Sequence, residues 1–173
     1  MDKYVGCKVI RKNRELHMHQ PEIMYKLKKE FGDDVKEICK YRTPAAPGFA
    51  VQRPTADDSL ISAEMQKRFR MAVGLLLFLV KFSMPDISNS VRELAKVNDS
   101  ATDKNFKQMM RAVKFALDTR LKALKFKLKH GKKNNEVWDV CGYFDSDYAG
   151  DKETRLSVSG LCVFVMGCLV SWR

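Results

Sequence analysis

The 173-residue sequence lacks the paired cysteines of metal ribbons and disulfide-stapled domains. Its five cysteines are odd in number, and no two of them form a Cys-x-x-Cys pair. The pattern therefore argues against a zinc site or a disulfide framework, and the cysteines are expected to be reduced intracellular thiols.

The sequence also lacks a long apolar run. The longest, Met71 to Val80, ends at Lys81, which makes it too short to cross a bilayer and typical of a buried helix. No signal peptide is recognisable, because basic residues interrupt the first apolar positions: Lys3, Lys8, Arg11 and Lys12. We therefore expect an intracellular protein without a transmembrane segment.

Acidic residues are scarce relative to basic ones. The chain has 21 Asp and Glu against 32 Lys and Arg, which gives a formal net charge of +11. This surplus favours a polyanionic partner, either nucleic acid or an anionic membrane. A membrane is the weaker candidate, because no helix opposes a basic face to one rich in Trp and Phe.

The first 62 residues predict three successive segments. Residues 4–19 read as a β-hairpin, and residues 21–31 as a short amphipathic helix whose apolar positions recur every four residues. Residues 41–62 are interrupted by three prolines and a glycine, which disfavour helix and remove backbone donors. We expect this last segment to be an extended, irregular tether that lies on a surface.

Three helices are predicted over residues 63–118. The first, 63–82, is apolar nearly all round from Met71 onward and should be largely buried. The second begins near Pro85, and the third covers about 102–118. A basic stripe follows one face of the third helix: Lys104, Lys107, Arg111 and Lys114. Two interpretations stay open, a phosphate-binding face and an ordinary solvated helix face.

After residue 118 the apolar period changes from 3.6 to 2, which predicts strands. We expect a half-solvated strand from Leu124, a basic turn over 130–135, a central strand over 136–145, and two further strands near 158–166 and 168–172. The central strand ends at Asp145, and two more aspartates follow: Asp147 and Asp151. A carboxylate at a strand end can hold a divalent metal, although Asp and Gly also make ordinary acidic turns.

Several segments together resemble copia-type retrotransposon polyproteins. Gly142 to Asp151, followed by Arg155, Ser157, Gly160 and Ser171-Trp172, is similar to the opening of their ribonuclease H domain. The region before it is similar to their segment between polymerase palm and ribonuclease H: Thr43-Pro44, Phe69-Arg70, Val73-Gly74, Leu76 to Leu79, Pro85 to Ser88, Val91 to Leu94, Arg111, Val113 to Phe115 and Thr119. Two positions depart from the family pattern, where Met84 replaces Arg and Asp118 replaces Gly.

The resemblance implies an α+β chain with four parts. These are the end of the polymerase palm at 1–40, the tether at 41–62, a helical thumb and connection at 63–122, and an incomplete ribonuclease H-like domain at 123–173. The Tyr-x-Asp-Asp hairpin of the polymerase is expected upstream of residue 1, and the remaining ribonuclease H carboxylates downstream of residue 173.

The resemblance also implies a chemistry. Asp145 takes the place of the first metal-binding catalytic carboxylate, and Mg²⁺ is the implied cofactor, although one carboxylate is not expected to hold it tightly. The parent would be an RNA-directed DNA polymerase with ribonuclease H activity, and this chain alone is expected to be inactive.

The resemblance implies two partners, an RNA–DNA hybrid and the rest of the Pol polyprotein. The expected location is the cytoplasm, a virus-like particle or the nucleus. The alternative is a non-enzymatic, retrotransposon-derived module that binds nucleic acid or protein.

Overall fold

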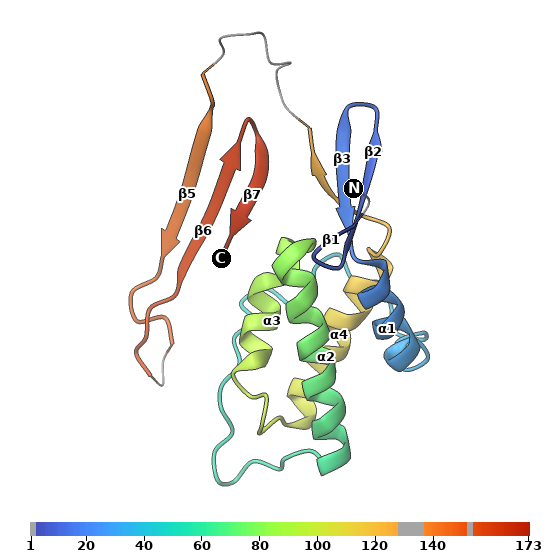
Figure 1. The fold of residues 1–173 in the computed structure, drawn as a ribbon. Helices are drawn as coiled ribbons and strands as arrows, with labels where there is room; N and C mark the ends of the chain where they lie inside the picture. Colours follow the sequence, from blue (N-terminus) through green and yellow to red (C-terminus); the bar gives the residue numbers. More distant parts are fainter. Residues whose placement is uncertain (1–2, 128–136, 152–153) are drawn as a thin grey trace. The chain divides into compact units, whose positions relative to one another are not determined.

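The computed structural model describes residues 3–127, 137–151 and 154–173 and has an α+β fold, as the sequence predicts (Figure 1). Its strands and helices follow in this order: β1 (Lys3–Tyr4), β2 (Cys7–Lys12), β3 (Glu15–His19), α1 (Pro21–Phe31), α2 (Ala63–Phe82), the 3₁₀ turn η1 (Pro85–Ile87), α3 (Ser88–Ala95), α4 (Asp103–Asp118), β4 (Leu124–Phe126), β5 (Val140–Ser146), β6 (Ser159–Val165) and β7 (Cys168–Trp172). The predicted basic turn over 130–135 lies outside the described residues.

The chain divides into two compact units. The first holds residues 1–8 and 19–123 and contains the four α-helices, and the second holds residues 9–18 and 124–173. Two antiparallel sheets are present, with strand orders β1-β2-β3-β4 and β5-β6-β7. The short strand β4 pairs with β3, so that Leu16 lies opposite Phe126. The sequence did not indicate this pairing, which joins segments more than a hundred residues apart in the chain.

The helices begin where the sequence supplies caps. The hydroxyl of Ser62 accepts a hydrogen bond from the Met65 amide at the start of α2, and Pro21 occupies the first turn of α1. Thr102 and Asn105 cap α4 reciprocally: the Thr102 hydroxyl accepts from the Asn105 amide, and the Asn105 side chain accepts from the Thr102 amide. These signals explain why the predicted boundaries of α1, α2 and α4 lie within a residue of the observed ones. The helix predicted from near Pro85 begins as the 3₁₀ turn η1 and becomes α-helical at Ser88.

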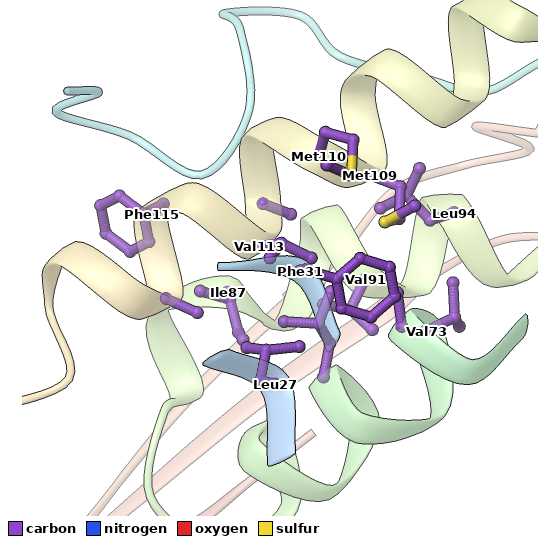
Figure 2. Close-up of a cluster of buried hydrophobic side chains, with 14 of the residues drawn as sticks. Leu27, Phe31, Val73, Ile87, Val91, Leu94, Met109, Met110, Val113 and Phe115 are labelled. Carbon is purple, nitrogen blue, oxygen red and sulfur yellow. The ribbon is translucent and has the colours of Figure 1, made fainter. Parts of the chain in front are cut away.

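The helical unit has a closed apolar core. Figure 2 shows its centre, where α1, α2, α3 and α4 bring together side chains that are buried: Leu27, Phe31, Val73, Ile87, Val91, Leu94, Met109, Met110, Val113 and Phe115. The tether adds Val51 to this cluster and Phe49 at its margin. Burial of these side chains is the main source of stability for the unit, at about 1.5–3 kcal/mol for each large one.

One expectation about the core is wrong. Helix α2 was expected to be largely buried, but Met71, Leu77 and Phe78 on its outer side are exposed. Only one side of the helix packs against α1, α3 and α4, through residues such as Phe69 and Leu76. The apolar residues around α2 therefore do not by themselves determine which side of the helix packs against the other helices.

In the described part of the chain, no helix combines the length and apolar character needed to cross a membrane.

Candidate nucleic-acid interface

Helix α4 presents a basic side opposite its buried one. Met109, Ala112, Val113 and Ala116 face the core, and at helical periodicity this leaves the lysine-bearing side outward. Lys104 and Lys107 are exposed. Among the described residues neither of these two lysines takes part in an ion pair. Their ammonium groups are therefore available to an external anion.

The other two members of the predicted stripe are already engaged within the protein. The Lys114 Nζ lies 3.0 Å from the Asp118 Oδ1, and the Lys114 side chain is only 14% exposed. This pair joins positions four apart on the helix, so it neutralises Lys114 locally. The four basic residues thus lie on one helix, as predicted, but they do not form one uniform row of free charges.

Arg111 reaches the tether instead of solvent. Its Nη2 donates to the Thr43 hydroxyl and to the Ala45 carbonyl, both at 3.0 Å, and the Thr43 carbonyl lies 3.4 Å from both Nε and Nη2. The guanidinium also stacks over the Tyr41 ring, 4.4 Å from its centroid. A planar guanidinium suits this combination of stacking and forked donation, which an ammonium group cannot reproduce.

Tyr41 provides a neutral face for this contact. Burial raises the pKa of its phenol above the usual value, and the neighbouring Cys39 side chain raises it further, against the opposing effect of Arg111. The ring therefore stays un-ionised at neutral pH, and the stack is a cation–π contact.

A second anchor holds the middle of the tether. The Val51 amide donates to the Glu93 Oε2 at 2.8 Å, and Glu93 is almost wholly buried on α3. Arg92 and Lys96 lie 2.6 and 3.1 Å from the other carboxylate oxygen. The buried carboxylate therefore has both counter-charges and a backbone donor, as a buried charge requires. Near its end, the tether contacts the segment just before α4, where the Ile61 amide donates to the carbonyl of Ala101, the residue before the N-cap.

Asp145 lies at an exposed position in β5, paired with Gly160 of β6. The two later aspartates organise the loop instead. The Asp147 Oδ1 accepts from the Val158 amide at 2.5 Å, and the Asp151 Oδ1 accepts from the Thr154 amide at 2.9 Å. Among the hydrogen bonds of the described residues, Asp147 and Asp151 therefore each accept one from a loop amide, and Asp145 accepts none.

The implied magnesium does not fit the side chains that the structure describes. Across residues 3–127, 137–151 and 154–173, no three His, Cys, Asp or Glu side chains gather closely enough to hold a metal ion. A two-metal centre needs several converging carboxylates, because Mg²⁺ exchanges its waters only for oxygen ligands in near-octahedral positions. We therefore derive no catalytic step through a metal.

Sequence reasoning missed the residues that hold the tether. Tyr41 belongs to no motif, and Glu93 lies in the segment Val91 to Leu94 without a role assigned to it; their partners Arg111 and Val51 are 70 and 42 residues away in the chain. Helical spacing gave no signal for Glu93, because the residues one turn before it on α3, Asn89 and Ser90, are polar.

Comparison with known proteins gives relatives of different kinds. The secreted RxLR effector protein 161 of Plasmopara viticola is 29% identical over 102 residues, which cover 59% of this chain and 68% of the effector. The retrovirus-related Pol polyprotein from transposon RE1 of Arabidopsis thaliana is 30% identical over 107 residues, 60% of this chain and 7% of the polyprotein. The uncharacterized mitochondrial protein AtMg00810 of the same plant is 33% identical over 108 residues, 60% of this chain and 40% of that protein.

The chain is similar to transposon Pol polyproteins. It spans only a small part of the length of these polyproteins, as the coverage of 7% shows. No protein-family model matches the chain, and no solved structure matches it. The predicted relation to retrotransposon polyproteins is thus confirmed at the level of sequence similarity, and the assignment to a particular region of them stays a prediction.

Proposed function

We propose that this chain is a retrotransposon-related module that binds the sugar-phosphate backbone of an RNA–DNA hybrid or another nucleic-acid duplex. The observation that carries the proposal is the pair of exposed lysines, Lys104 and Lys107, one helical turn apart on a rigid helix. The net charge of +11 and the similarity to transposon Pol polyproteins support it.

The binding is expected to be independent of base sequence. Lysine ammonium groups act as point charges toward phosphate oxygens, and such contacts give affinity and orientation without base readout. Each phosphate contact releases condensed counterions, so affinity falls steeply as salt rises. The expected signature is therefore a strong salt dependence with little preference among sequences.

The direct test replaces both lysines with glutamate. Lys104→Glu with Lys107→Glu should weaken binding to a short fluorescent RNA–DNA hybrid and make the slope of log K against log salt shallower by about 0.9 per lost contact. The matched control is Lys26→Glu with Lys29→Glu, because these exposed lysines of α1 have the same spacing and the change in net charge is identical. Equal binding by the two double variants would reject the α4 interface.

Asp145 has a proposed role only where further carboxylates converge on it, as in a ribonuclease H-like domain. There it would serve as the first of several metal-binding carboxylates, and the chain by itself would hydrolyse nothing. The test is an assay of the purified chain for cleavage of the RNA strand of a hybrid in the presence of Mg²⁺. Cleavage that disappears in Asp145→Asn would show that the chain is an enzyme in its own right.

One observation favours a second candidate, an independent module without catalysis. The aligned residues make up 68% of the effector from Plasmopara viticola, so a region similar to this chain forms most of that protein. Such a module would use the same basic surface for nucleic acid or would bind protein. A pull-down that recovers one protein partner in nuclease-treated extract, with no affinity of the pure chain for hybrid, would favour this candidate.

A further inference from the structure

The tether follows α4 along most of its length and runs in the opposite direction. Thr43 and Ala45 contact Arg111 near the middle of the helix. Ala46 and residues 48–55 then line a cavity of about 390 Å³ together with Lys104, Asn105 and Gln108, further toward the start of the helix. Finally, Leu60 forms a β-bridge with Thr102, the N-cap of α4. The tether is therefore a second element alongside the basic helix.

This path brings additional cations to the basic side of α4. Lys40 and Arg42 flank Tyr41, whose ring lies against Arg111, and both are exposed. Arg53 is also exposed and lines the same cavity as Lys104. Among the described residues, Lys40 and Arg42 form no ion pair.

The acidic groups of the tether lie near its far end. Asp58 lines the cavity that Lys104 also lines, and its Oδ2 accepts from the amide and the hydroxyl of Thr55 at 2.7 and 3.0 Å, which lowers the pKa of its carboxyl and keeps it anionic. Asp57 is exposed beside it. Lys40 and Arg42 lie at the other end of the tether, more than a dozen residues away in an extended segment.

We propose that the tether is the second half of the phosphate-binding surface, and that Arg111 is a positioning residue that holds it there. Resting on the proposed function, we assign the phosphate contacts to Lys40, immediately before the tether, and to Arg42 within it, together with Lys104 and Lys107 of α4. Arg111 contributes by fixing Tyr41 and Thr43, and not by touching a phosphate. Its guanidinium is occupied by two carbonyls, a hydroxyl and an aromatic ring.

The first experiment reverses the tether charges. Lys40→Glu with Arg42→Glu should weaken binding to the RNA–DNA hybrid and make the salt slope shallower by about 1.8, which corresponds to two lost contacts. Between about 50 and 200 mM salt, this variant should lose roughly tenfold less affinity than the unmodified chain. Both side chains are exposed, so the fold should be unaffected. The control is again Lys26→Glu with Lys29→Glu.

The second experiment releases the tether without changing any charge. Tyr41→Ala removes the ring under Arg111, and Arg111→Lys keeps the charge but loses the stack and the forked donation. Both variants should weaken hybrid binding several-fold and speed amide exchange in residues 41–46. Tyr25→Ala, at an exposed tyrosine of α1, should leave both properties unchanged.

The outcomes separate this inference from the function on which it rests. If the α4 double variant weakens binding while the Lys40 and Arg42 variant equals its control, the tether has no part in the interface and the inference is overturned. If Arg111→Lys binds like the unmodified chain, Arg111 is a point charge and not a positioning residue. If the α4 double variant also equals its control, the proposed function itself fails.

Discussion

The helical unit and the β5-β6-β7 sheet are both hydrogen-bonded through their backbones but differ in how they bury side chains. Twenty-two buried residues form the core of the helical unit, including Phe69, which is 0% exposed. In the described part of 137–173, only Met166 and Cys168 are buried, and Phe144 is 79% exposed. Yet β5 and β6 pair continuously over seven residues. Hydrogen-bonded strands therefore define a sheet here without closing a core, and a sheet needs an apolar face covered before it is stable alone.

The largest expected difference in the free energy of unfolding is between substitutions of a buried phenylalanine of the helical unit, Phe69, and an exposed phenylalanine of the sheet, Phe144. Phe69→Ala should destabilise the helical unit by about 3–5 kcal/mol, because it opens a cavity in a closed core. Phe144→Ala should change stability by no more than about 0.5 kcal/mol, as an exposed side chain does.

Urea unfolding followed by two probes measures both. Far-UV circular dichroism reports the helices, and fluorescence reports the sheet unit, since both tryptophans, Trp138 and Trp172, belong to it. The fluorescence transition should come first in the unmodified chain. A large loss of stability in Phe144→Ala would contradict this contrast between the two regions. It would mean that the face of the sheet that carries Phe144 is covered in solution.

The next effect tests the buried anchor of the tether. Glu93→Ala removes the acceptor of the Val51 amide and leaves that donor unpaired, which should cost about 1–3 kcal/mol. Glu93→Gln keeps an acceptor oxygen and should cost less. Urea unfolding by circular dichroism gives the free energies, and the exchange rate of the Val51 amide gives the local effect. Equal costs for the two variants would show that the hydrogen bond is not what Glu93 contributes.

A smaller effect is expected at the start of α4. Thr102→Ala removes one half of the reciprocal cap and should lower stability by about 1 kcal/mol. Ser62→Ala, which removes a one-way cap on α2, is the comparison and should cost less. Thermal unfolding of both variants measures the difference. The reverse ranking would mean that the Asn105 side chain adds nothing to the cap.

The smallest effect belongs to the loop after β5. Asp147→Ala removes the acceptor of the Val158 amide in an exposed loop, so we expect a loss of less than about 1 kcal/mol. The loss should appear in the fluorescence transition and not in circular dichroism, since the loop belongs to the sheet unit. Asp145→Asn, at an exposed carboxylate of β5, is the control and should have no effect. A shift of the circular dichroism transition would show that the two units unfold together.

The candidate site shows how far local sequence patterns reach. The stripe on α4 was predicted from helical spacing, and the structure places all four basic residues on that helix. The pattern could not predict whether each basic side chain is exposed, ion-paired or hydrogen-bonded to another segment. Lys104 and Lys107 are exposed, Lys114 is paired, and Arg111 holds the tether. The difference arises from neighbours that are distant in the chain or that lie on another turn of the helix.

Local chemistry was enough to predict most of the elements, although the predicted single hairpin over 4–19 contains a further short strand, β1, and a turn at Val5-Gly6. The spacing of apolar residues and the caps gave the helices, the prolines gave the tether, and the turn at Gly167, whose φ of 76° suits glycine, separated β6 from β7. Only the tertiary structure decided which side of α2 stayed exposed, that β4 pairs with β3, and that Arg111 binds Tyr41 and Thr43. These outcomes depend on contacts between segments far apart in the chain, and such contacts are set by packing of the whole unit, which no local pattern records.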